Sequence, residues 1–497
     1  MKERKPTASC IDSASRWSCF AELLLRLSAP LSTMILARLL MPEVFGLAAA
    51  VAVVLSLAEI VQDAGFRTCL IQHEFRTQDE LERATAVALT AALSLSFLLC
   101  AVLLPLRGAL AAWAGMADVA PALTLALLSL PFSACSGILN ARFRRDFRFR
   151  LLFRVRAAEA FSPLFITVPL ALCWPSFWAL AAGMLGRSLL RSFMLVRLAR
   201  RERMRGLRLR FDAELFAEMF GFSLWTSVEF FVIWLCGALP LALVGRLLDA
   251  HALGLYSTAV TTSAQIMAAV SAAFLPVAFS AFSRVQDSAA ALGDSLLLFQ
   301  RRMAFFLFPL GTGVFLFSDM AVAILLGPHW QEAAPFLGAY CAALTLVHSV
   351  CHLSSEAIRA LGRPRLSALL HGVYAFLHGG LVFWAASRSF SCLVWASVAS
   401  CGLFCLLHAA SLHHLLGLTA GRMIVNMRFP MLASLVMLAF GTWFRHGHGS
   451  LLWDAAGIPL CIAVYLGLFV CIRPARQECA DLVRMFRGRG TDQDALL

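Results

Sequence analysis

A few ionisable residues lie inside apolar blocks that are long enough to span a membrane, and they could bind an anionic group. A charge at the bilayer centre costs roughly 2.5–3.5 kcal/mol on insertion scales, so each such residue is a candidate for function. Glu22 and Arg26 lie one helical turn apart with the acid first, the favourable order for a helical ion pair, and Arg187 and Arg191 have the same spacing. Arginine binds phosphate oxygens two at a time through a planar, permanently charged fork. The candidate substrate-binding residues are Arg26, Arg187, Glu22, Glu229 and Arg191.

These residues also have a purely structural interpretation. In that interpretation Glu22 and Arg26 form a buried ion pair that only stabilises its helix. Arg191 extends its charged head toward the cytoplasm along an apolar stem. Glu159 is a further acid inside an apolar block, and it belongs to the same group of residues that need an explanation.

A second group of residues that could do chemistry follows a single helical face. His348, His352 and Glu356 are spaced four residues apart, and His371 and His378 stand in the next apolar block. Two histidines and a glutamate could bind zinc, but such a site needs an open cavity, and we expect no metal. Histidine titrates near neutral pH, so His348, His352 and Glu356 are instead a candidate proton relay. Ordinary helix packing is the alternative.

The elements that must position these residues are membrane-spanning helices. Of the 497 residues, 60% are hydrophobic and only 14% are charged, against about a quarter charged in a soluble protein. A spanning helix needs about 20 mostly apolar residues. No strand-like alternation accompanies the apolar blocks, so we expect an all-α polytopic membrane protein with about fourteen transmembrane helices. The predicted spans are 16–41, 44–63, 85–106, 119–139, 151–173, 175–196, 218–244, 254–282, 303–326, 333–355, 367–387, 391–412, 429–444 and 451–472.

The distribution of Lys and Arg tests this count, because cytoplasmic loops of membrane proteins collect positive charge. With a cytoplasmic N-terminus, the inner segments hold 34 of the 42 Lys and Arg, and the outer segments hold 4. We therefore expect both termini to be cytoplasmic. The net charge of +13 then reflects topology and contact with lipid headgroups, not nucleic-acid binding. The first span is too long and too charged to be a cleaved signal peptide.

One sequence motif, called the repeated motif below, occurs twice in the chain. "ARLLMPEVFGL" (37–47) and "GRLLDAHALGL" (245–255) share five residues at a constant offset of 208. Each lies at the end of a predicted span that runs outward, and the two copies are six spans apart, so the two halves have parallel orientation. Arg38 and Arg246 lie at this outer rim, where gating or anchoring of a turn is as good an interpretation as substrate contact. Duplication of a six-helix unit explains the repeat.

The repeat sets the expected organisation, which is two pseudo-symmetric six-helix lobes followed by a C-terminal helix pair. We expect an N-terminal lobe at 1–196, a basic cytoplasmic linker at 197–213, a C-terminal lobe at 214–412, the extra helix pair at 413–472 and a cytoplasmic tail at 473–497.

Five segments resemble the polysaccharide exporters of the MOP superfamily, the membrane flippases for lipid-linked oligosaccharides. They are "ILARLLMPEVFGLAAAVAVV" (35–54), "DAGFRTCLIQHE" (63–74), "VGRLLDAHALGLYSTA" (244–259), "FLPVAFSAFSRVQ" (274–286) and "LLGPHWQEAAP" (325–335). The resemblance covers most of 15–390 and implies two six-helix bundles that work by alternating access without an ATPase domain. It departs from the family at Pro240, which occupies a position where relatives often have an aspartate.

The resulting prediction is a transporter in a bacterial inner membrane. It would move a polyprenyl-phosphate-linked oligosaccharide outward for O-antigen, capsule or exopolysaccharide assembly. A drug or cation antiporter of the same superfamily is the alternative, and an integral-membrane polymerase or ligase is a third possibility that short outer loops argue against. No P-loop and no nucleophile constellation occurs, so we expect neither enzymatic activity nor a cofactor. The expected partners are the lipid-linked substrate, membrane lipids and a polymerase of the same pathway.

Overall fold

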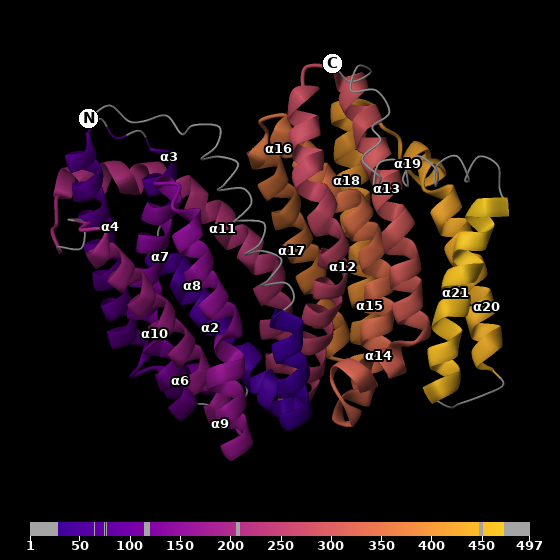
Figure 1. The fold of residues 1–497 in the computed structure, drawn as a ribbon, viewed down its shortest axis with the longest axis horizontal. Coiled ribbons are helices and arrows are strands. Elements are labelled where there is room, and N and C mark those ends of the chain that lie inside the picture. The colour runs from indigo at the N-terminus through magenta and orange to yellow at the C-terminus, as the bar shows by residue number, and fades with distance from the viewer. Residues whose placement is uncertain are drawn as a thin grey trace. The chain divides into compact units, whose positions relative to one another are not determined.

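The computed structural model describes residues 28–63, 65–73, 75, 77–113, 120–204, 209–446 and 451–471. These residues form helices joined by short turns, and none of them lies in a strand, which confirms the all-α prediction (Figure 1). Residues 28–39 are helical. The elements that follow are α2 (Pro42–Asp63), α3 (Phe66–Gln72), α4 (Gln78–Leu103), α5 (Arg107–Trp113), α6 (Ala120–Leu127), α7 (Leu130–Arg145), α8 (Phe149–Ser162), the π-helical turn η2 (Pro163–Thr167), α9 (Val168–Cys173), α10 (Phe177–Arg201), α11 (Ala213–Leu247) and α12 (Ala250–Arg284).

The second half of the described chain is also helical. Its elements are α13 (Ala289–Leu316), α14 (Ser318–Leu325), the 3-10 turn η4 (Pro328–Ala333), α15 (Ala334–Leu346), the π-helical turn η5 (Val347–His352), α16 (Leu353–Ala360), α17 (Pro364–Ala386), α18 (Phe390–Leu416), α19 (Ala420–Asn426), α20 (Arg428–Arg445) and α21 (Leu451–Cys471).

The described helices account for most of the predicted spans. Eleven are long and apolar enough to cross a membrane. The number rises to 13 if two bent pairs each count as one span, α13 with α14 (85°) and α19 with α20 (60°). These 13 correspond to the second through fourteenth predicted segments, whereas the first, 16–41, lies outside the described residues up to position 27. The chain is thus a multi-pass membrane protein, and the count of fourteen is not confirmed.

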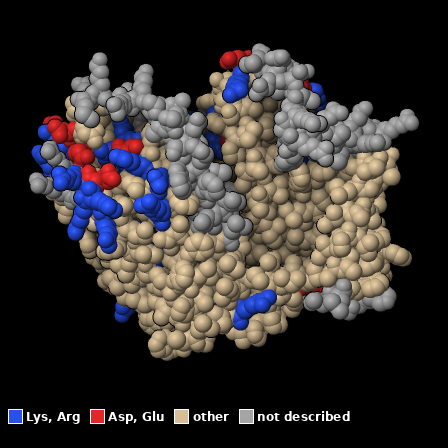
Figure 2. All heavy atoms as spheres, viewed as in Figure 1, with Lys and Arg blue, Asp and Glu red and all other residues tan. Residues whose placement is uncertain are grey.

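The described chain divides into two compact units. Unit 1 comprises the described residues up to 258 together with 382–387, and unit 2 comprises 259–381 together with the described residues from 388 onward. In unit 1, most of the Lys, Arg, Asp and Glu atoms visible in Figure 2 gather at one end of the helices that Figure 1 colours indigo to magenta, and a few Lys or Arg atoms are visible near the other end. Such an uneven distribution agrees with the predicted charge asymmetry. The lobe boundaries and the orientation of the termini stay predictions.

The two copies of the repeated motif contact each other within unit 1, where the first turns of α2 and α12 cross. A Cβ built on Gly46 would lie 1.9 Å from the carbonyl oxygen of Ala250, and one built on Gly254 would lie 1.9 Å from that of Pro42. Glu43 Oε1 and His251 Nδ1 are 2.8 Å apart, and these two residues are 208 positions apart in the chain. Only glycine allows two backbones to approach so closely. The duplicated segments therefore meet as near-equivalent partners.

In unit 2, the C-terminal helices α20 and α21 pack against α13 and α14. Their shared core includes Leu316, Met437 and Tyr465, whose hydroxyl donates a hydrogen bond to the carbonyl of Phe305 over 2.9 Å. Arg445 at the end of α20 binds the carboxylates of Asp319 (2.5 Å) and Asp454 (3.1 Å), and it also bonds the carbonyl of Leu316. One guanidinium thus ties the helix pair to α14. That this pair was added to a duplicated six-helix unit stays a prediction.

Candidate functional site

The site is built around a break after α2, which the sequence "DAGFR" encodes. Helix α2 ends at Asp63, and Gly65 adopts a left-handed conformation (φ 75°) that glycine accepts without strain. The chain then starts α3 with Phe66, which is 1% exposed and anchors the new helix in the core. Asp63 Oδ1 accepts a hydrogen bond from the backbone N–H of Arg67 (3.4 Å) and lies 3.2 Å from its Nε. The break therefore fixes the position of Arg67.

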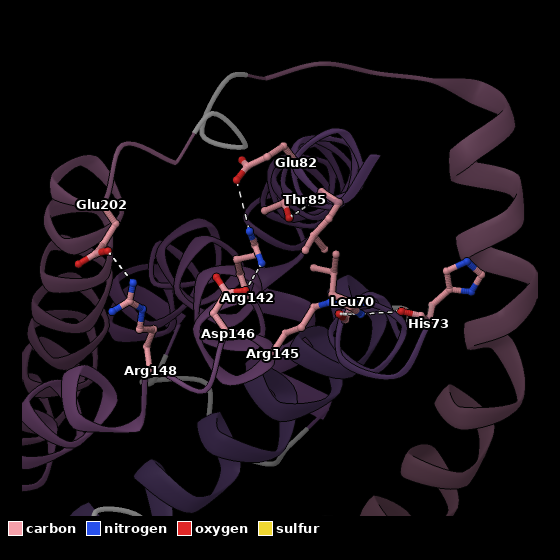
Figure 3. Close-up of polar contacts among 10 residues, drawn as sticks. Leu70, His73, Glu82, Thr85, Arg142, Arg145, Asp146, Arg148 and Glu202 are labelled. Atoms are coloured by element: carbon pink, nitrogen blue, oxygen red, sulfur yellow. Dashed lines mark hydrogen bonds and ion pairs between the residues drawn. The ribbon is translucent and has the colours of Figure 1, made fainter. Parts of the chain in front are cut away.

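Helix α3 is held at its C-terminal end by α7. The Arg145 guanidinium donates hydrogen bonds to the carbonyls of Leu70 (3.0 Å) and His73 (2.5 Å), as Figure 3 shows. It also lies 4.9 Å from the centroid of the Phe75 ring. A cation at a helix C-terminus satisfies free carbonyls and complements the helix dipole. Arg145 thus has a structural role that the sequence did not reveal.

Arg142, one turn earlier on α7, is a second structural arginine. It is 2% exposed, lies 3.3 Å from Glu82 of α4, and forms an ion pair with Asp146 (Figure 3). Burial raises the pKa of the Asp146 carboxyl, and the Arg142 charge acts in the opposite direction. Arg148 binds Glu202 over 3.3 Å. Much of the basic run 142–150 therefore binds other parts of unit 1.

A cavity of about 300 Å³ lies where α3, α7, α8 and α10 meet. We call it the basic cavity, and its lining residues are Arg67, Ile71, Gly137, Asn140, Ala141, Arg144, Arg156, Glu159 and Arg191. Four of these side chains are always cationic and one is acidic, so the cavity has an excess of positive charge. Its volume is at the lower end for ligand sites, which suits a compact headgroup better than a whole glycolipid.

Glu159 organises one wall of the basic cavity. Its Oε1 lies 3.4 Å from Arg191 Nη1 and 3.5 Å from Arg187 Nε. Helix α10 carries the two arginines one turn apart, so they reach the same carboxylate on α8. The buried Nε of Arg191 has no hydrogen-bond partner among the described residues. A donor of this kind is free to bind an anion.

Gly137 makes room for the opposite wall. A Cβ on Gly137 would lie 2.3 Å from Arg67 Nε, so any side chain there would displace the guanidinium. The absence of a side chain on α7 is what lets Arg67 lie across this helix. The cavity can thus present guanidinium groups from α3 and α10 to one anionic ligand.

The structure describes only some of the predicted site residues. Arg187 and Arg191 both lie close to Glu159. The sequence pointed to these three residues only because they stand deep inside apolar blocks. Glu22 and Arg26 lie outside the described residues. Glu229 belongs to α11, in a stretch whose side chains are outside the described part. Their roles stay predictions.

The predicted rim residues also keep their status as predictions. Arg38 and Arg246 are both exposed. Arg38 ends the helix before α2, and Arg246 lies in the last turn of α11 before α12, so both lie next in sequence to the crossing of the repeats.

The histidine group belongs to unit 2 and is arranged differently from the expected single helical face. The helix widens to a π-helical turn over 347–352, and the rings of His348 and His352 lie 4.4 Å apart. Glu356 pairs with Arg359 on the same helix instead of with a histidine. No observation tests the relay role.

Sequence reasoning missed four polar residues of the basic cavity, namely Arg67, Asn140, Arg144 and Arg156. Arg67 stood within a quoted segment, but its position at the end of a span made it an ordinary cytoplasmic charge. Arg144 and Arg156 were counted as topology signals for the same reason. The glycine at 137, opposite Arg67, gave no signal without the fold.

Comparisons with known proteins identify the family of the chain. The family model described as "Polysaccharide biosynthesis protein" matches residues 35–335. The lipopolysaccharide biosynthesis protein WzxC of Escherichia coli (strain K12) is 22% identical over 368 residues, covering 73% of each chain. The teichuronic acid biosynthesis protein TuaB of Bacillus subtilis (strain 168) is 23% identical over 284 residues, covering 56% of this chain and 58% of that protein.

Two solved structures share the fold. The lipid II flippase MurJ, in an inward closed conformation, has a TM-score of 0.74 at 13% identity and covers 92% of this chain and 97% of its own. An inward-facing multidrug resistance MATE transporter of the MOP superfamily has a TM-score of 0.61 at 12% identity, covering 80% and 99%. Since the family model spans more than half of the 497 residues, this chain belongs to the polysaccharide biosynthesis protein family.

Proposed function

We propose that this chain is a flippase that moves a polyprenyl-phosphate-linked oligosaccharide across a bacterial inner membrane for surface polysaccharide assembly. The observation that carries the proposal is the basic cavity, in which Arg67, Arg144, Arg156 and Arg191 outnumber Glu159. The names of the sequence relatives, which concern lipopolysaccharide and teichuronic acid biosynthesis, support a substrate of this class.

The chemistry of such a substrate matches the cavity. Its phosphate or diphosphate must cross about 30 Å of hydrocarbon, whereas its lipid tail can stay in the bilayer. In our proposal the forks of Arg67 and Arg191 hold the phosphate oxygens, and Glu159 orients Arg191 when no substrate is bound. By the predicted topology, the cavity lies toward the cytoplasmic end of unit 1, where the substrate is loaded.

Transport of an anion is favoured over the alternatives. A drug or cation antiporter would need acidic groups at its site, and four cationic side chains in the basic cavity oppose a cationic ligand. Polymerase or ligase activity would need a catalytic constellation, and none was recognised in the sequence. We include in the proposal that both termini are cytoplasmic and that a polymerase of the same pathway receives the product.

The test is a pair of substitutions in a strain that lacks the chromosomal copy. Arg67→Gln combined with Arg191→Gln should leave protein level and membrane insertion unchanged while abolishing surface polysaccharide and leaving lipid-linked precursor in the inner leaflet. Arg191→Lys should retain part of the function, because it keeps the charge but loses the fork. Arg200→Gln, an exposed position on the same helix α10, is the matched control. Wild-type polysaccharide from the double variant would overturn the proposal.

A further inference from the structure

Unit 2 contains a cluster of histidines that the basic cavity does not use. His348 lies in η5, His371 and His378 lie in α17, and His408 lies in α18. His348, His378 and His408 are 7%, 5% and 0% exposed, so three imidazoles are buried inside a membrane protein. Ionisable groups inside a membrane domain are costly and usually serve ligand or ion pathways.

The rings follow one another across three helices. His348 and His352 lie 4.4 Å apart between ring centroids, and His371 and His408 lie 6.2 Å apart. His352 is close enough to His371 and to His408 for their charges to interact. The side chain of His352 is exposed, whereas that of His408 is fully buried. The cluster therefore connects an imidazole on the surface of unit 2 with one in its interior.

The hydrogen bonds of these rings are incomplete. His348 Nδ1 is hydrogen-bonded to Ser271 Oγ over 2.6 Å, and His371 Nδ1 to the carbonyl of Ser367 over 2.8 Å. In contrast, both ring nitrogens of His408 and the Nδ1 of His378 are buried without a hydrogen-bond partner among the described residues. Burying a polar atom without a hydrogen-bond partner is costly, so these ring nitrogens need a physical explanation.

The local backbone also sets this cluster apart. The π-helical turn η5 interrupts the span formed by α15 and α16, and turns of this kind occur frequently at functional sites. The ring of Phe404 lies 5.4 Å from that of His371 and 4.6 Å from that of His408. Aromatic rings near an imidazole can stabilise a positive charge that forms there.

The chemistry of the cluster identifies its ligand. Hard cations such as Mg²⁺ and Ca²⁺ are bound by oxygen atoms, which these nitrogen-rich rings do not supply. The described residues include no group of three His, Cys, Asp or Glu placed to hold a metal ion. A proton is the cation that imidazole nitrogens bind near neutral pH. A neutral imidazole carries hydrogen on one ring nitrogen and can accept a proton on the other, so the unpartnered rings are suited to bind one proton each.

We propose that His348, His352, His371 and His408 form a proton-binding site, and that proton movement through this cluster drives export of the anionic substrate. This inference rests on the proposed function and adds the coupling ion to it. It replaces Glu356 of the expected relay with His371 and His408, because Glu356 is bound to Arg359.

The surroundings of the cluster contain few other titratable groups. Among the described residues, the charges that act on the buried rings are those of neighbouring imidazoles and of Arg359. The Cys351 and Cys405 thiols lie 3.6 Å apart between η5 and α18, and Tyr374 stacks on His378. Helix α12 contributes the neutral Ser271. Like charges repel, so the cluster is expected to bind protons one after another, as stepwise coupling needs.

The experiment measures proton binding without substrate. Purified full-length protein in liposomes is adsorbed on a solid-supported membrane, and the pH is stepped across the titration range of imidazole. The wild type should give a transient charge displacement. The double variant His371→Gln and His408→Gln should lose it, whereas His413→Gln with His414→Gln, two exposed positions on α18, should keep it. Equal transients in both double variants would overturn the proposal.

Two further measurements keep the result decisive. If the buried substitution prevents folding, His348→Gln with His352→Gln takes its place, and an unchanged transient there also refutes the site. A wild-type protein that gives no transient refutes it without any variant. Surface polysaccharide is measured in parallel. Normal polysaccharide production by a protein that gives no proton signal would refute only the proton site. A proton signal from a protein that cells do not need for polysaccharide production would refute the proposed function.

Discussion

Replacing Gly46 or Gly254 with alanine is expected to force α2 and α12 apart where the two repeats cross. The new methyl group would lie 1.9 Å from a backbone carbonyl oxygen in either case, whereas ordinary contact begins at 3.4 Å. The helices must therefore separate by the difference, about 1.5 Å, because a backbone oxygen cannot rotate away as a side chain can. Overpacking of this kind costs about 1–3 kcal/mol.

Two smaller effects adjust this magnitude. Separation would lengthen the contact of 2.8 Å between Glu43 and His251, whose side chains are 50% and 34% exposed, so its loss adds at most about 1 kcal/mol. Alanine in place of glycine recovers up to about 1 kcal/mol of helix propensity. We expect a net destabilisation of about 2 kcal/mol for each single variant.

The informative comparison is the double variant. Both methyl groups act at one crossing, so the separation that relieves the first clash also relieves most of the second. The double variant should be destabilised by about as much as either single variant, which corresponds to a coupling energy of about 1–2 kcal/mol. Apparent melting temperatures of the purified protein, followed through its 11 tryptophans, would rank the four proteins. Surface polysaccharide from the same variants reports whether the crossing matters for transport.

The control is Gly237→Ala in α11, where a Cβ would meet nothing within 4 Å. It should be neutral or slightly stabilising, by up to about 1 kcal/mol. The reasoning is refuted if Gly46→Ala and Gly254→Ala behave like this control, or if their effects on stability simply add.

Three further predictions follow from the packing and from the sequence. Gly137→Ala should lower surface polysaccharide with little change in melting temperature, because it displaces only the flexible end of Arg67. Arg445→Met should destabilise the protein by about 3 kcal/mol or more, measured by thermal melting, because it leaves a largely buried aspartate of α21 without its partner. Glu22→Leu with Arg26→Leu, outside the described residues, should accumulate normally and yet fail to support polysaccharide, whereas wild-type amounts would make the pair structural.

The sequence alone determined the class of the protein and most of its spans. Hydrophobic length and the Lys and Arg bias are local properties, fixed by bilayer thickness and by charge, so 13 of the predicted segments correspond to helices or bent helix pairs. The bends were not predictable, since α13 and α14 meet at 85° within one apolar block. The repeated motif indicated a duplication, but only the fold placed Gly46 against Ala250 and Gly254 against Pro42.

The candidate site was predicted only in part. Arg187 and Arg191 stood out because a charge deep in an apolar block is costly wherever the helix packs. Arg67, Arg144 and Arg156 lie near span ends, where positive charge is expected for topology. The sequence therefore did not distinguish them from ordinary cytoplasmic arginines. The direction in which each of these side chains points depends on how α3, α7, α8 and α10 pack. Four arginines of separate origin thus became one basic cavity through tertiary structure alone, while Arg142 and Arg145, from the same basic run, became internal ties.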